Sequence, residues 1–105
     1  MKDTFRHKGL RQILVDELIG KGISDQSVLS MINEIPRHLF MDNAFVQFAY
    51  KDKAFPIGSG QTISQPYTVA FQTELLQLNP YEKVLEVGTG SGYQAAVLIG
   101  MEANV

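Results

Sequence analysis

The sequence predicts an α/β protein of the doubly wound type, with helices on both faces of a mostly parallel sheet. Three consecutive features predict this fold class. The run Val84–Val87 is apolar except for Glu86, which is typical of a short strand buried on both faces. The apolar run 95–99 then begins a helix that packs back on this strand, and a ligand site is expected at the strand's carboxyl end. Between strand and helix stand three glycines at alternate positions: Gly88, Gly90 and Gly92.

The spacing of these glycines indicates which ligand the turn binds. Glycine costs stability inside regular structure, so the repeat indicates a tight turn whose backbone approaches a ligand. The dinucleotide fingerprint G-x-G-x-x-G requires a third glycine where Tyr93 stands, and the Gly-Lys-Ser/Thr of a phosphate-binding loop is absent from the sequence. The pattern acidic-x-Gly-x-Gly-x-Gly, from Glu86 to Gly92, resembles the first motif of the S-adenosylmethionine-dependent methyltransferases. A generic nucleotide-type turn and a merely tight connection remain alternatives.

Composition limits the possible functions. With 105 residues, 45% of them apolar, the chain is expected to form one small folded unit. The net charge of −2, without a basic patch, argues against nucleic acid or an anionic membrane as partner. The absence of cysteine excludes disulfides, thiolate catalysis and cysteine metal sites. The amino terminus is polar, unlike a secretory signal, and every apolar run is too short to span a membrane, so a cytoplasmic location is expected.

The length of the chain matters for the cofactor site. In a doubly wound nucleotide-binding unit, an acidic residue that holds the ribose hydroxyls lies roughly 20 residues beyond the first glycine. Counted from Gly88, this places it beyond Val105. The sequence is therefore expected to be the amino-terminal part of a longer protein, truncated after its first strand–loop–helix unit. One complete strand leaves apolar edges exposed, so self-association of the chain, or further chain over the strand, is expected.

Residues 1–53 are expected to form an amino-terminal layer of helices. Apolar residues at helical spacing predict an amphipathic helix over about 4–21. Ser24 or Asp25 caps a second helix that ends before Pro36. The two histidines, His7 and His38, are expected at the surface and in local structure, without forming a metal-ligand cluster. The expected buried residues are Leu10, Ile13, Leu14 and Leu18 in the first helix and Val28, Leu29, Met31 and Ile32 in the second.

Residues 54–105 are expected to begin the methyltransferase domain, as one structural unit with 1–53. The part of this run before Pro66 shows neither helical nor clean strand periodicity. Pro66 suits the first turn of a helix, which makes Ser64 or Gln65 its expected cap. The amino-terminal helices are expected to pack against the sheet that begins with the central strand.

Three stretches, in this order and at these separations, resemble the protein-L-isoaspartate O-methyltransferases over nearly the whole chain. Ile35–Phe40 is similar to the family's amino-terminal helical region. The run Pro56–Pro66 is the distinctive one, because general methyltransferases lack it, and 84–93 carries the shared cofactor motif. The resemblance implies a doubly wound, Rossmann-like fold of the S-adenosylmethionine-dependent methyltransferases with extra amino-terminal helices.

The resemblance also implies a reaction. The enzyme would transfer the methyl group of S-adenosylmethionine to the free α-carboxylate of L-isoaspartyl residues in damaged proteins, which are its substrates in protein repair. The isolated chain of 105 residues is expected to be inactive, because the ribose-binding acid and the adenine wall are missing. The active-site residue that the resemblance implies is Ser64. The cofactor-binding residues that it implies are Gln61, Thr62, Ile63, Ser64, Glu86, Gly88, Thr89, Gly90 and Gly92.

These residues suit the chemistry. A carboxylate with a pKa near ~4 is already ionised at neutral pH and needs no general base. It is a weak, hydrated nucleophile that must be oriented, and hydroxyl and N–H donors of the run Gln61–Ser64 can do this without removing its charge. Ser64 is thus expected to position the carboxylate and not to attack.

Several alternatives remain. Ser64 can be only a helix cap, Glu86 can make a plain structural hydrogen bond, and Tyr93 can line the pocket or simply pack. The chain can belong to another S-adenosylmethionine methyltransferase with a small-molecule acceptor, or be a non-catalytic fragment. A nicotinamide oxidoreductase is disfavoured by Tyr93, which stands where glycine is required.

Overall fold

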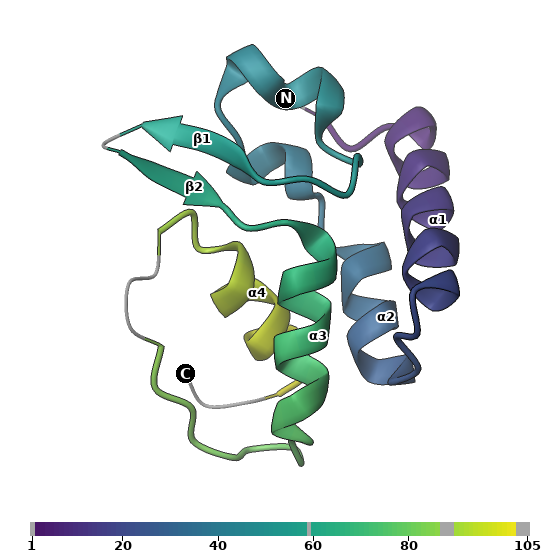
Figure 1. Cartoon of the computed structure of the whole chain (residues 1–105), viewed down its shortest axis with the longest axis vertical. Coiled ribbons are helices and arrows are strands. Elements are labelled where there is room, and N and C mark those ends of the chain that lie inside the picture. Colours follow the sequence, from purple (N-terminus) through teal and green to yellow (C-terminus); the bar gives the residue numbers. More distant parts are fainter. Residues whose placement is uncertain (1, 59, 87–89, 103–105) are drawn as a thin grey trace.

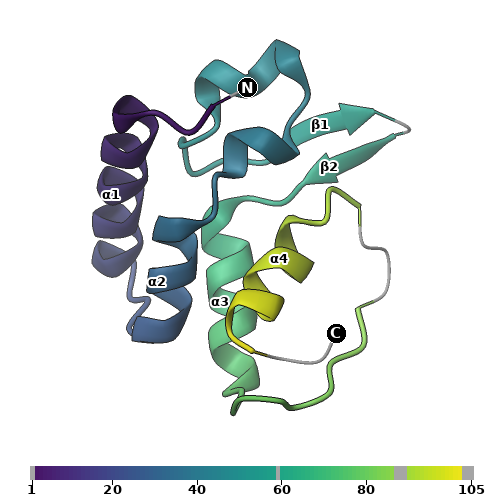
Figure 2. The ribbon, with the colours of Figure 1, turned by 180° about the vertical axis from the view of Figure 1, so that it is seen from behind.

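The computed structural model describes residues 2–58, 60–86 and 90–102 (Figure 1). Helix α2 packs against α1, α3 and α4, and the β1–β2 hairpin lies beside the amino-terminal end of α3 (Figure 1, Figure 2). The elements of this part of the chain are α1 (Phe5–Gly20), α2 (Gln26–Glu34), the 3-10 turns η1 (Arg37–Phe40) and η2 (Asn43–Phe48), β1 (Phe55–Gly58), β2 (Gln61–Ile63), α3 (Pro66–Leu76) and α4 (Tyr93–Gly100).

Helix α1 begins where the sequence predicts but buries a partly different face. Thr4 caps it, because its Oγ1 accepts the N–H of His7 while the His7 ring accepts the N–H of Thr4. Ile13, a predicted core residue, is 64% exposed, whereas Arg11 is buried. Burial of Arg11 is possible because the Asp3 carboxylate pairs with it at 2.6 and 2.8 Å and raises its pKa. The residues that α1 buries are Arg11, Leu14, Val15 and Leu18.

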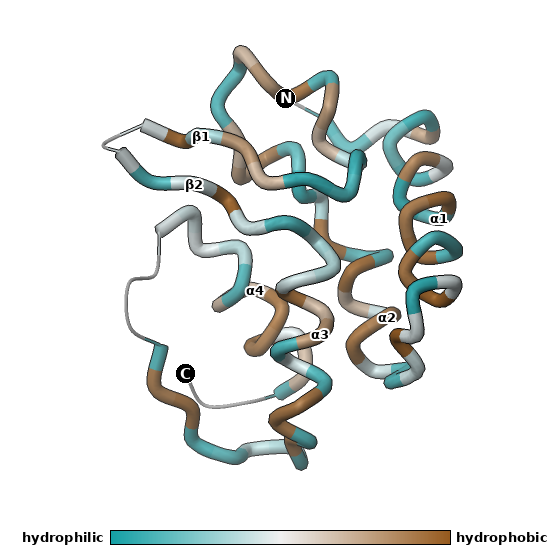
Figure 3. The backbone as a smooth tube through the Cα atoms, viewed as in Figure 1, coloured by the Kyte–Doolittle hydropathy of each residue, from teal (hydrophilic) through white to brown (hydrophobic). Residues whose placement is uncertain are grey.

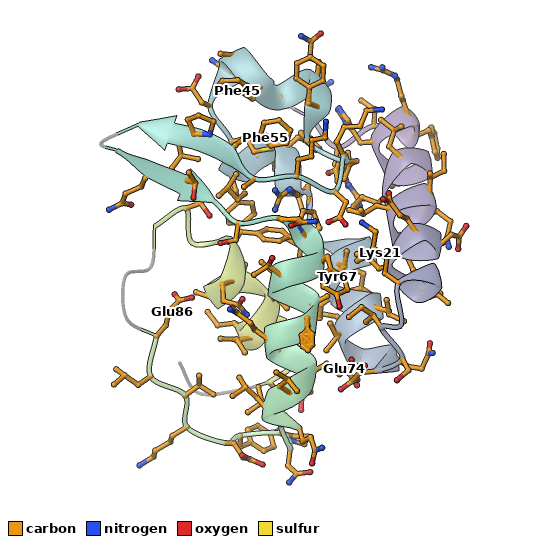
Figure 4. All side chains as sticks on the ribbon, in the orientation of Figure 1. Lys21, Phe45, Phe55, Tyr67, Glu74 and Glu86 are labelled. Atoms are coloured by element: carbon orange, nitrogen blue, oxygen red, sulfur yellow. The ribbon has the colours of Figure 1, made fainter. Side chains whose placement is uncertain are left out.

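Helix α2 is capped from two sides. Of the two predicted caps it is Asp25 whose side chain accepts the N–H groups of Ser27 and Val28. The Glu74 carboxylate of α3 accepts the N–H groups of Ser24 and Asp25 at 2.8 and 2.7 Å (Figure 4). The bond from the Ser24 N–H is the largest cause of a lowered Glu74 pKa. The second cap lies 50 residues away in the chain, so no local pattern indicates it.

The irregular run before Pro66 forms a hairpin, which the sequence did not indicate. Strands β1 and β2 pair antiparallel, with Phe55 opposite Ile63. Gly58 and Gly60 have φ values of 94° and 70°, a region that side chains other than glycine rarely adopt. Strands of four and three residues are too short for a period of two to stand out. The sequence held one hairpin signal, the glycines at 58 and 60 between two short runs, which the sequence analysis did not interpret in this way.

The prediction of a buried central strand is wrong for the part of it that the structure describes. Lys83 makes an isolated bridge, residues 84–86 are in no strand, and Leu85 is 89% exposed. A parallel strand exists through hydrogen bonds to its neighbours, and among the described residues the hairpin is the only sheet. Helix α2 therefore packs on α3 and α4 instead of on a sheet, and α1 packs on α2. Val87 lies outside the described residues.

The apolar core lies where the four helices meet, and Ile63 joins it from β2. Figure 3 shows apolar stretches in each of these helices. Helices α2 and α4 approach so closely that a Cβ on Gly100 would lie 2.3 Å from the Met31 sulfur. Phe55 of the hairpin packs on Phe45 of η2, with 5.7 Å between the ring centroids (Figure 4). Within the residues described, none of the helices combines the length and apolar character that crossing a membrane requires.

His7 and His38 lie together, contrary to the sequence prediction. Their rings stack with centroids 3.8 Å apart, and the ligand atoms of both histidines and Asp3 lie within 4.8 Å of one another. Each of these three side chains already has a hydrogen bond within the protein: Asp3 with Arg11, His7 with Thr4, and His38 with the Lys2 carbonyl oxygen. The cluster therefore fastens the residues before α1 to η1.

The hydrogen bonds of His38 define its tautomer. Nε2 lies 3.0 Å from the Lys2 carbonyl oxygen, which only accepts, so Nε2 carries the hydrogen. Nδ1 then accepts from the Tyr50 hydroxyl at 2.7 Å, and that hydroxyl accepts from Arg11 at 3.0 Å. This chain of bonds requires a neutral His38. Burial is the largest cause that lowers the pKa of His38, and the nearby His7 and Arg11 lower it further. The Lys2 carbonyl oxygen and Asp3 raise it, but the net shift is downward.

The chain is expected to lose stability as the pH falls below about 6.5, because His38 then binds a proton more readily in the unfolded state. The sign follows from the lowered pKa. The contribution of neutral His38 to the free energy of unfolding is complete above the ordinary histidine pKa, and it is lost as the pH falls through the pKa of the folded state. Urea unfolding at several pH values measures the effect. His38→Gln should remove the pH dependence in this window, and His7→Gln should keep it. An equal slope in the His38→Gln variant would contradict the assignment. Asp3 and Glu74 have lowered pKa values, so their contributions to stability are lost only when the pH falls below the ordinary carboxyl pKa of about 4, outside this window.

Candidate active site

A cavity of about 440 Å³ lies between the end of β2, one face of α3, residues 84–86 and the start of α4. Thr62 and Ser64 border it on one side, and Glu86 and Gly90 on the other. The two stretches that the sequence singled out as the acceptor and cofactor segments thus meet at one cavity. Its remaining polar lining comes from Gln72, Thr73, Ser91 and Gln94, and its other lining residues are Val69, Leu76, Val84, Leu85, Tyr93 and Leu98.

Helix α3 is capped by Asp52, so the interpretation of Ser64 as its cap is wrong. Gln65 occupies the cap position without a side-chain bond. Asp52 Oδ1 accepts the N–H of Tyr67 at 2.8 Å, and Lys21, the residue after α1, pairs with Oδ2 (Figure 4). The hydrogen bond with Asp52 is the largest cause of a raised Lys21 pKa. Asp52 is 15 residues from Tyr67, beyond the reach of a capping motif in sequence.

The Ser64 hydroxyl is therefore available to a ligand. Ser64 is exposed and makes no hydrogen bond within the described part of the chain. Thr62 is also exposed and borders the same cavity. Their neighbours in β2 face elsewhere: Ile63 is 1% exposed in the core, and Gln61 is exposed away from the cavity lining. Two hydroxyls from alternate residues thus point to one space, as the period of a strand requires.

Glu86 brings one carboxylate to the opposite wall. Figure 4 shows its side chain extending from residues 84–86 toward α4. Its Oε1 is buried and has no hydrogen-bond partner among the described residues. A buried acceptor without a donor costs about 1–3 kcal/mol, so a ligand that brings N–H or O–H donors gains from meeting it. The plain structural hydrogen bond that the sequence allowed for Glu86 is not present in this part of the structure.

The glycine turn has the backbone that its sequence predicts. Gly90 and Gly92 have φ values of 56° and 82°, and Gly92 stands in the left-handed region at the start of α4. Ser91, which the sequence analysis did not single out, borders the cavity, and its Oγ accepts the N–H of Tyr93 at 3.1 Å. The predicted cofactor residues Gly88 and Thr89 lie outside the described residues.

The floor of the cavity is a polar bridge between α4 and α3 that the sequence analysis missed. Gln94 Nε2 donates to Thr73 Oγ1 at 2.7 Å, and Thr73 donates to the Val69 carbonyl oxygen at 2.7 Å. Tyr93 both lines the cavity and packs, since it is 1% exposed and burial raises its pKa to about 12. The bridge joins residues 21 apart in the chain, so spacing could not reveal it.

This arrangement suits binding and orientation more than proton transfer. Among the described lining residues only Glu86 and Tyr93 can ionise, and the others offer hydroxyls and amides. Neutral donors can hold the oxygens of an anion while leaving its charge for reaction. The turn at Gly90 and Gly92 and the Glu86 carboxylate can bind a ligand that brings its own N–H or O–H donors.

Two solved structures define the class of protein: the chain matches part of the doubly wound, Rossmann-like α/β fold of S-adenosylmethionine-dependent methyltransferases that its sequence predicts, and the described part of it contains the hairpin sheet. A protein-L-isoaspartate O-methyltransferase is 31% identical and superposes with a TM-score of 0.76, covering 89% of this chain and 32% of that one. A Plasmodium falciparum structure of the same description, in complex with S-adenosyl-L-homocysteine, is 29% identical with a TM-score of 0.70, covering 90% and 42%. The chain belongs to the protein-L-isoaspartate(D-aspartate) O-methyltransferase family, whose sequence profile matches residues 9–104.

Bacterial relatives in this family match the chain from end to end. The protein-L-isoaspartate O-methyltransferase of Cytophaga hutchinsonii is 63% identical over 105 residues, which is all of this chain and 48% of the relative. That of Christiangramia forsetii is 65% identical over the same length, 49% of the relative. The chain therefore spans about half the length of the curated relatives that it matches.

Proposed function

We propose that the protein of which these residues form part transfers the methyl group of S-adenosylmethionine to the free α-carboxylate of L-isoaspartyl residues in damaged proteins and peptides. The observation that carries the proposal is the shared cavity, where Thr62 and Ser64 face Glu86 and Gly90. Membership of the family and the S-adenosyl-L-homocysteine held by the Plasmodium falciparum neighbour support it. The transfer would convert the carboxylate to a methyl ester, the first step of protein repair.

On the acceptor side, Thr62 and Ser64 are proposed to bind the two oxygens of the isoaspartyl carboxylate. Each hydroxyl donates one hydrogen bond, and the carboxylate keeps its charge because no proton moves. Alignment of reacting groups can lower a barrier by roughly 7–11 kcal/mol. Ser64 is the residue proposed to be catalytic, and it acts by holding the substrate. Its hydroxyl is free for this because Asp52 caps α3.

On the cofactor side, the residues present fit S-adenosylmethionine. When bound, this cofactor supplies an electrophilic methyl group on a cationic sulfur. The unpaired, buried Oε1 of Glu86 suits a ligand with ammonium and hydroxyl donors, which this cofactor has. Gly90 and Gly92 would let the turn approach it closely. The remaining proposed cofactor residues are Thr62, Ser64, Gly88 and Thr89, whereas Gln61 and Ile63, which the sequence also predicted, do not line the cavity.

The division of the chain follows from this proposal. Residues 54–105 would carry both sides of the cavity and begin the methyltransferase domain. Residues 1–53 would form the helical layer that supports it, as one unit, since α2 packs against α3 and α4. A cytoplasmic location, the absence of nucleic-acid partners and self-association through exposed residues such as Leu85 stay predictions.

A chimera tests the proposed function. Residues 1–105 replace the matched part of the Cytophaga hutchinsonii relative, which gives a chain of full family length. This chimera is expected to transfer labelled methyl groups to an isoaspartyl peptide and not to the same peptide with a normal aspartyl residue. The 105-residue chain alone is expected to show no turnover. Equal labelling of the two peptides, or no labelling of either by a folded chimera, would refute the proposal.

A further inference from the structure

Arg37 is a fully buried cation in the η1 turn, within the run Ile35–Phe40 to which the proposed function assigns no role. It is 0% exposed. Its Nε donates to the Ala49 carbonyl oxygen at 3.0 Å and its Nη2 to the Lys53 carbonyl oxygen at 3.1 Å. No carboxylate of the described residues forms an ion pair with it. Burial lowers the pKa of Arg37, the sign of a charge held in an unfavourable place.

This guanidinium lies close to the ring of Tyr93. The Arg37 carbon Cζ is 5.0 Å from the centre of the Tyr93 ring, within the range of a cation–π contact. Phe40, from the same turn, meets the Tyr93 ring edge-on at 5.7 Å. Arg37 Nη1 and the Tyr93 hydroxyl are buried without a hydrogen-bond partner in the described part of the chain. Arg37 and Phe40 of one short turn thus both contact the Tyr93 ring, which is also part of the apolar core.

The partners of Arg37 lie in segments that lead to the two sides of the cavity, and Tyr93 among them lines it. Residues 49–53 lead directly into β1, and they include Asp52, which fixes the start of α3 behind Ser64. Tyr93 is the first residue of α4, immediately after the glycine turn, and it lines the cavity. Arg37 therefore joins the acceptor side to the cofactor side through a rigid, planar group with several donors.

We infer that Arg37 is a positioning residue: it holds the Thr62–Ser64 segment and the Gly90–Gly92 turn at a fixed separation without touching a ligand. The inference rests on the proposed function of the cavity. Lysine is not expected to replace arginine here, because its single nitrogen cannot occupy both the Nε and the Nη2 positions from which Arg37 reaches the two carbonyl oxygens. Loss of this link would let the two sides of the cavity shift relative to each other.

The test compares Arg37→Lys with Arg11→Lys in the full-length chimera. Arg11 is the control: it is also a buried arginine and it also reaches the 49–53 segment, through Tyr50, but its other partners are Asp3 and the Asn33 carbonyl oxygen, so it makes no link to the Tyr93 ring. Arg37→Lys is expected to lower kcat by about 10- to 100-fold, since misplacement of reacting groups by an ångström has effects of this size. The KM for the isoaspartyl peptide should change far less. Arg11→Lys should lower the Tm and leave kcat per folded enzyme unchanged.

Amide hydrogen exchange gives a readout that does not depend on turnover. Arg37→Lys should increase exchange in peptides covering both 60–65 and 90–94, whereas Arg11→Lys should leave both unchanged. A chimera without substitutions that lacks turnover refutes the proposed function, and the exchange data then decide the role of Arg37 alone. If Arg37→Lys does not fold, Tyr93→Leu removes the ring contact and should increase exchange at 90–94. Unchanged kcat per folded enzyme, or unchanged exchange in the folded variant, would overturn the inference.

Discussion

Replacing Ser64 by alanine is expected to lower kcat of the chimera by about 100- to 1,000-fold, the usual effect of removing one donor that holds a reacting oxygen. The structure explains why the effect should fall on catalysis and not on folding. Asp52 caps α3, and Ser64 bonds to no other described residue, so its hydroxyl contributes little to the fold. The Tm of Ser64→Ala should therefore match that of the parent.

The measurement is a steady-state methyl-transfer assay with an isoaspartyl peptide, together with calorimetric titration of S-adenosylhomocysteine. Binding of this product should change far less than kcat if Ser64 holds the carboxylate. Ser30→Ala serves as the control, because it makes the same chemical change on the exposed side of α2. Turnover by Ser64→Ala at the parent rate would remove Ser64 from the mechanism.

Replacing Asp52 by alanine is expected to destabilise the chimera by about 2–3 kcal/mol, the range for losing a buried, charge-assisted hydrogen bond together with a helix cap. The Asp52 side chain is 2% exposed and links three parts of the chain: the segment before β1, the first turn of α3 and Lys21 at the end of α1. Asp52→Asn should lower the free energy of unfolding by about half as much. Its amide oxygen can still accept the N–H of Tyr67, whereas the ion pair with Lys21 is lost.

Urea unfolding measures this prediction through the midpoint at constant slope. Glu17→Ala is the matched control, since Glu17 also contacts Lys21, at 3.4 Å, but on an exposed surface where such pairs contribute about 0.5 kcal/mol or less. A midpoint of Asp52→Ala equal to that of Glu17→Ala would show that the cap is dispensable. Because Asp52 also fixes the helix start behind Ser64, kcat should fall together with stability.

Features built from neighbouring residues could be predicted from sequence. Helices α1 and α2 follow from apolar spacing, Asp25 is one of the two caps predicted for α2, and Pro66 correctly marks the first residue of α3. The positive φ angles at Gly90 and Gly92 follow from a motif that only glycine serves well. The hairpin was missed because its strands are shorter than a periodic pattern needs.

The residues that support the cavity could not be predicted in this way. Thr73 and Gln94, Asp52 and Tyr67, and Arg37 and Tyr93 meet only after the helices have packed. Each member alone is an ordinary residue on a helix or loop. A contact between distant segments produces no recognisable spacing of residues in the sequence. The side chains that support the site are therefore identified only by the tertiary structure.

By itself the sequence determined the family, the order of the helices and the two segments that form the cavity, because these depend on motifs a few residues long. Only the tertiary structure decided that Ser64 is free and Asp52 is the cap, that Leu85 is exposed, and that Arg37 lies between the two sides of the site. Those outcomes depend on which distant groups satisfy each buried charge and each helix end, and that is decided by packing in three dimensions.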